Sequence, residues 1–72
     1  MIDEEQFFKI RGGCLTNAVR AIQNGHDYDS TVSNNFKSFI AVIEPQMGVT
    51  IEGDNYTEQL RRFTDDVDKN LK

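Results

Sequence analysis

Cys14 and His26 are the only pair in this chain that could act as a nucleophile and its general base. Nucleophilic catalysis needs these two side chains within hydrogen-bond reach, with a third group that orients the base. Cys14 falls on the apolar side of a predicted first helix, and His26 follows the end of that helix. About 12 residues of helix, roughly 18 Å, would therefore separate them. The sequence predicts a small core thiol, a solvated loop imidazole and no enzyme activity.

The possible metal-ligating residues do not have the spacing of a known metal site. The run 27–31, Asp-Tyr-Asp-Ser-Thr, begins like a calcium-binding loop. Such a loop needs Asp or Asn at its fifth position, glycine at its sixth and glutamate at its twelfth, where this chain has Thr31, Val32 and Ser38. Zinc needs three or four convergent ligands, and the chain has one histidine and one cysteine. We expect neither a metal nor a cofactor.

Three basic residues, Lys9, Arg11 and Arg20, make the predicted first helix locally cationic. Lys9 and Arg20 are about three helical turns apart, so they do not converge within one copy of the chain. In an oligomer they could frame an anion site. This leaves an alternative function open, in which the protein is an oligomeric binder or sequestering protein for a small anionic ligand.

The composition limits which partners, location and oligomeric state can be expected. The chain has 72 residues, enough for one domain (1–72), and a net charge of −4 from 12 acids and 8 Lys+Arg. This balance argues against nucleic acid and anionic membranes as partners, since both attract clustered Lys and Arg. No run approaches the ~20 apolar residues that span a bilayer. The lone cysteine and the lack of a signal sequence predict a cytoplasmic protein. Because so short a chain builds a small core, we expect a homo-oligomer.

The chain reads as an all-α domain of three helices. Asp3 and Gln6 form a capping box that starts the first helix, and Asn24-Gly25 ends it. Gly12-Gly13 interrupts the pattern, because each interior glycine costs about 1 kcal/mol relative to alanine. We expect the helix to break there; the alternative is that another backbone approaches closely.

The second helix is predicted to begin at a cap on Asp29 or Ser30. Apolar residues then recur at helical spacing from Val32 to Ile43, and Pro45 disfavours helix at Glu44 and marks its end. A hairpin over 39–51 is the competing interpretation, because the run from Phe39 to Ile43 is also rich in β-formers. We favour helix, with a short extended segment near 49–52.

The third helix has the cleanest amphipathic pattern. Asn55 and Glu58 form its capping box, and opposite charges four residues apart stabilise its exposed side. The apolar stripe that follows consists of Tyr56, Leu60, Phe63, Val67 and Leu71.

Five phenylalanines are more than a small helical bundle easily buries. Phe7 and Phe8 are adjacent and about 100° apart around a helix, so one of them should point away from the core. An exposed aromatic edge is typical of a partner surface. The candidate interface consists of Phe7, Phe8, Leu60, Phe63, Val67 and Leu71.

The segment 39–53, FIAVIEPQMGVTIEG, resembles one helix-turn segment of the AsiA-type phage anti-sigma factors. The similarity lies in Phe39-Ile40-Ala41, Gly48-Val49-Thr50 and Glu52-Gly53, with a two-residue gap at Pro45-Gln46. It covers about a fifth of the chain and not the first helix, which forms the sigma contact in that family. The resemblance implies a small acidic helical protein of phage type that occludes a sigma subunit.

These patterns predict a non-catalytic interaction protein. It would bind another macromolecule, most simply a protein, through an apolar helical face with an acidic rim. A phage-type regulator of host transcription or defence is one specific form of this function.

Overall fold

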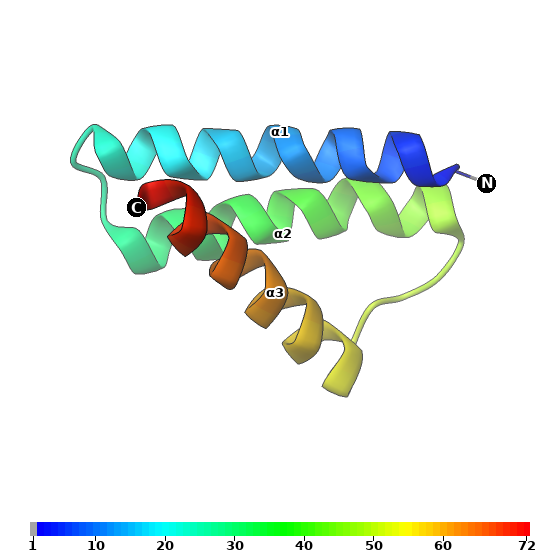
Figure 1. Cartoon of the computed structure of the whole chain (residues 1–72). Helices are drawn as coiled ribbons and strands as arrows, with labels where there is room; N and C mark the ends of the chain where they lie inside the picture. The colour runs from blue at the N-terminus through cyan, green and yellow to red at the C-terminus, as the bar shows by residue number, and fades with distance from the viewer. Residues whose placement is uncertain (1) are drawn as a thin grey trace.

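The computed structural model describes residues 2–72 and contains three helices in this range and no strand. They are α1 (Glu4–Gln23), α2 (Tyr28–Met47) and α3 (Gly53–Leu71). Helices α1 and α2 lie antiparallel, and α3 crosses them diagonally, with its carboxyl-terminal end beside them and its amino-terminal end further away (Figure 1). The all-α prediction is confirmed, and residues 39–47 are helical rather than part of a hairpin.

Helix α1 is continuous through Gly12 and Gly13, so the predicted break is wrong. The alternative, a close backbone approach, is also absent among the described residues: a Cβ added at either glycine would meet nothing within 4 Å. The helix persists because its flanks supply enough stability, with Asp3 capping the first turn and Ala18 buried in the core. The glycines therefore weaken α1 without breaking it.

Helix α2 also differs from its prediction at both ends. The cap is Asp27, whose carboxylate accepts a hydrogen bond from the Ser30 N–H at 2.9 Å, and not Asp29 or Ser30. Pro45 lies inside the last turn, where it removes only one backbone donor, and the helix continues to Met47. Gly48 ends the helix with a φ of +69°, and its N–H donates to the Glu44 carbonyl oxygen at 2.9 Å.

Residues 49–52 connect α2 to α3 without strand pairing. The Ile51 N–H donates to the Glu44 carboxylate at 2.7 Å, and the Ile51 side chain is buried in the core. Helix α3 then begins at Gly53, two residues before the predicted cap at Asn55, and Glu52 precedes it without a side-chain cap. Glu58 contacts Arg61 and Arg62 instead of closing a capping box.

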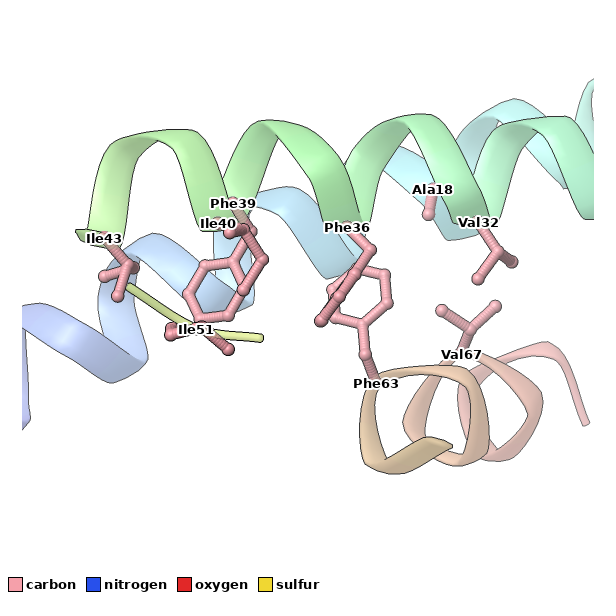
Figure 2. Packing of buried hydrophobic residues seen from close by; sticks show 9 residues of the cluster. All are labelled: Ala18, Val32, Phe36, Phe39, Ile40, Ile43, Ile51, Phe63 and Val67. Atoms are coloured by element: carbon pink, nitrogen blue, oxygen red, sulfur yellow. The ribbon is translucent and has the colours of Figure 1, made fainter. Parts of the chain in front are cut away.

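The core lies where the three helices meet, and most of its fully buried residues come from α2. The predicted α2 stripe faces two residues of α3, Phe63 and Val67, with Ala18 of α1 behind it and Ile51 below one end (Figure 2). Phe63 stacks on Phe39 with ring centroids 6.4 Å apart. The buried apolar residues are Ala18, Val32, Phe36, Phe39, Ile40, Ile43, Ile51, Phe63 and Val67.

Gly13 and Gly48 allow a matched test of these helix assignments. Gly13→Ala should raise the free energy of unfolding by about 0.5–1 kcal/mol, because Gly13 is in an exposed helix interior with room for a methyl group. Gly48→Ala also has room, but its positive φ should make the change destabilising by about 1 kcal/mol. Urea unfolding of both variants measures the difference. A loss of stability in Gly13→Ala would contradict a continuous α1.

Candidate functional site

An open groove of about 410 Å³ separates the amino-terminal half of α1 from α3. Phe8 is its most prominent apolar residue, with 54% of its surface exposed. The groove is lined by Phe7, Phe8, Arg11, Gln59, Arg62, Asp65, Asp66 and Lys69. We call it the α1/α3 groove.

As the sequence predicts, one of the two adjacent phenylalanines packs inward and the other is exposed. The Phe7 ring packs edge-on against Phe39, with centroids 5.5 Å apart, and so belongs to the edge of the core. The Phe8 ring meets the Phe7 ring edge-on at 5.2 Å, and more than half of the Phe8 surface is exposed to solvent. Phe7 therefore covers part of the Phe8 ring and leaves the rest of this large apolar surface available to a partner.

A second, apolar hollow of about 100 Å³ adjoins the α1/α3 groove, because Phe7 and Gln59 line both. Met47 and Val49 border this hollow and are 38% and 50% exposed. Three of the four exposed large hydrophobic residues thus line one or the other of these two adjoining hollows, whereas the fourth, Val42, lines neither. Such grouping distinguishes a candidate binding surface from ordinary scattered exposure.

Arg11 of α1 links the two helices that form the α1/α3 groove. Its guanidinium lies 2.8 Å from the Asp66 carboxylate and 5.9 Å from the centre of the Phe63 ring. Its side chain is only 14% exposed, so the ion pair is partly shielded from solvent. The sequence suggests Arg62 as the partner of Asp66, four residues away; helix spacing alone could not reveal the contact across to α1.

The structure does not bring the three candidate anion contacts together. Arg11 is engaged by Asp66, and Lys9 and Arg20 are exposed. Arg20 instead borders a separate hollow that Leu15 and Val19 also line.

The third-helix part of the predicted interface needs correction. Phe63 and Val67 are fully buried within the chain, because α3 turns its apolar stripe onto α2. They cannot contact a partner while this core is intact. Leu60 and Leu71 are half-buried at the edges of the same stripe, as Phe7 is at the edge of the core, which leaves Phe8 as the one exposed residue of the predicted interface.

Cys14 and His26 lie in different parts of the structure, one within α1 and the other in the turn that follows it. Cys14 lies half-buried in the middle of α1, and burial raises the pKa of its thiol, which is the opposite of what a reactive cysteine needs. His26 is exposed in the turn after α1. No group of three or more His, Cys, Asp or Glu side chains among residues 2–72 could hold a metal ion.

One further polar contact fixes α3, and with it the groove. The Tyr28 hydroxyl, at the start of α2, donates a hydrogen bond to the Asp68 carboxylate near the end of α3. This hydrogen bond raises the pKa of Tyr28 to about 12, helped by partial burial and by the charges of Asp68, Asp29 and Asp65. The sequence gives no sign of this contact, because 40 residues separate its partners.

Comparisons with protein-family models, curated proteins and solved structures found no match for this chain. The resemblance of 39–53 to AsiA-type proteins therefore stays a prediction. Within the described part of the chain, no helix has both the length and the apolar character needed to cross a membrane.

A double-mutant cycle on Arg11 and Asp66 tests the link across the groove. Asp66→Asn should lower the free energy of unfolding by about 1–2 kcal/mol, because it leaves a partly buried guanidinium without its counter-charge. Arg11→Met should cost about as much, and the double variant should cost less than the sum. Additive losses in urea unfolding would show that the two side chains do not interact.

Tyr28→Phe should destabilise the protein by about 1 kcal/mol at neutral pH, because a hydrogen bond to a charged acceptor is lost. A tyrosine with a raised pKa contributes its full stability below about pH 10, where the unfolded chain also keeps the proton, and loses it as the pH rises toward 12. The gap between wild type and Tyr28→Phe in thermal unfolding should therefore close over that window. A gap that stays constant would contradict the Tyr28–Asp68 contact.

Proposed function

We propose that this protein is a non-catalytic binding module that contacts another protein through the surface around Phe8. The observation that carries the proposal is the Phe8 ring, 54% exposed yet held against Phe7 at the rim of the α1/α3 groove. Leaving an aromatic ring in water forgoes the stability that its burial would bring, and aromatic residues often dominate binding energy at protein interfaces.

The rim of the groove favours a protein over a polyanion as the partner. Arg62 and Lys69 lie there together with Asp65 and Asp66, so both signs of charge surround the apolar centre. A polar rim around an apolar centre is typical of protein interfaces, whereas binding to nucleic acid needs clustered positive charge. The net charge of −4 supports the same choice.

The cellular role that we propose is regulatory and of phage type, acting on host transcription or defence in the cytoplasm. It rests on the resemblance of residues 39–53 to AsiA-type proteins. This segment provides Met47 and Val49, which border the hollow next to the groove. The alternative, capture of a small anion by Lys9, Arg11 and Arg20, has less support because Arg11 already pairs with Asp66.

Site-specific photo-crosslinking in cells that produce the protein tests this function. A benzoylphenylalanine replacing Phe8 should give a light-dependent adduct with a protein. The same group replacing Val42, which is 43% exposed but lines neither hollow, is the matched control and should give none. The adduct should survive high salt before irradiation, because an apolar contact is not screened. No adduct from position 8, or equal adducts from both positions, would refute the proposal.

A further inference from the structure

Helix α1 ends in a turn built around Asn24 and Gly25, at the opposite end of the helix from Phe8 (Figure 1). The Gly25 N–H donates to the Ile22 carbonyl oxygen and the His26 N–H donates to a carbonyl oxygen one residue earlier, both at 3.0 Å. With the φ of +95° at Gly25, these two bonds form a Schellman motif. Glycine is required here because a side chain would strain a backbone with this φ.

An asparagine followed by glycine can also convert into aspartate without an enzyme. The Gly25 nitrogen loses its proton and bonds to Cγ of Asn24, the bond from Cγ to the amide nitrogen breaks, and that nitrogen leaves as ammonia. Water then opens the resulting five-membered succinimide ring at either carbonyl, which gives aspartate or isoaspartate. Glycine favours ring closure because it has no Cβ to crowd the attacking nitrogen. Both residues are exposed, so water reaches them.

The folded turn holds the reacting atoms apart. Ring closure requires the Gly25 nitrogen to lie on the same side of the Cα–C bond as Cβ of Asn24. Asn24 instead has a ψ of 9°, which places the Gly25 nitrogen nearly eclipsed with the backbone nitrogen of Asn24. The proton that must leave Gly25 is also held by the Ile22 carbonyl oxygen. Asn24 therefore cannot react until the last turn of α1 opens.

This turn is held by few contacts. Residues 24–27 are exposed, and in the last turn of α1 only Ala21 and Ile22 are half-buried. Helix ends open at free energies well below that of global unfolding. The hydrogen bond from Tyr28 to Asp68 holds the start of α2 independently of this turn. The last turn of α1 can thus open while the core stays packed.

We propose that Asn24 is a site of spontaneous deamidation, gated by the opening of the last turn of α1. The inference does not depend on the proposed function. A carboxylate at residue 24 lies at the negative end of the helix dipole, where it is unfavourable. Isoaspartate also lengthens the main chain by one atom, so the N–H groups of Gly25 and His26 cannot both keep their acceptors. The change is irreversible, and it leaves a turn that opens more readily.

Peptide mass spectrometry of the full chain, incubated in mildly alkaline buffer, tests the site. The other asparagines all lie in helices and precede residues with side chains, and they serve as internal controls: Asn17, Asn34, Asn35, Asn55 and Asn70. In the folded chain Asn24 should convert faster than any of these, and in urea that unfolds the chain it should convert at least tenfold faster still. Conversion of folded Asn24 at the rate of the controls, or at its rate in urea, would overturn the proposal.

Two variants separate opening of the turn from unfolding of the whole chain. Ile22→Ala removes the largest half-buried side chain of the last turn and should speed conversion in the folded protein severalfold. Gly48→Ala strains the far end of α2 and should leave the rate unchanged. Circular dichroism establishes that both variants are folded. Acceleration by Gly48→Ala, in proportion to its loss of stability, would show that Asn24 reacts only after global unfolding and would refute the gate.

The converted chain provides a further check. It carries one more negative charge than the original net charge of −4, so ion exchange separates the two forms. The converted form should unfold at a lower urea concentration, because its turn has lost hydrogen bonds. An unchanged urea midpoint would contradict the role of the Schellman motif in holding this turn.

Discussion

The packing of Phe63 fixes α3 against the other two helices. Its ring packs against Phe36 at 5.5 Å and Phe39 at 6.4 Å, which fastens the middle of α3 to the middle of α2. Arg11 then lies over the same ring from α1, so one side chain contacts both of the other helices. Helix α3 crosses its neighbours diagonally, with Phe63 and Val67 buried against them (Figure 1). Near its amino-terminal end, Tyr56 packs edge-on against Phe36 of α2 at 5.2 Å.

The groove follows from this crossing. A helix aligned with α1 and α2 could have covered Phe7 and Phe8, but a diagonal helix leaves their end of α1 open. Arg11 and Asp66 bridge part of the opening, and they do so with an ion pair rather than with apolar side chains. The link therefore fixes the distance between the walls while leaving the Phe8 ring uncovered. The exposed surface results from how the core is built.

The sequence predicted what hydrophobic periodicity controls, but of its three predicted helix caps only the one at Asp3 is confirmed. The correct predictions depend on residues close together in the sequence. They are the three helices, the apolar stripe of α2, the cap at Asp3 and the exposure of one of the two adjacent phenylalanines. The prediction failed where packing outweighs a local preference. Gly12-Gly13 and Pro45 each disfavour helix by an amount that a well-packed helix can offset, and in both places the helix continues.

The candidate site was predictable only in part, for a related reason. Hydrophobic periodicity identifies the apolar side of α3 but not what covers it, so Phe63 and Val67 looked as available as Phe8. The Arg11–Asp66 and Tyr28–Asp68 contacts join residues far apart in the sequence and depend on the crossing of α3. Because that crossing decides which stripe is buried, it also decides which apolar residues remain for a partner. These residues lie on α1 and beside the 49–52 connection, and both places border the part of α3 that diverges from the other helices.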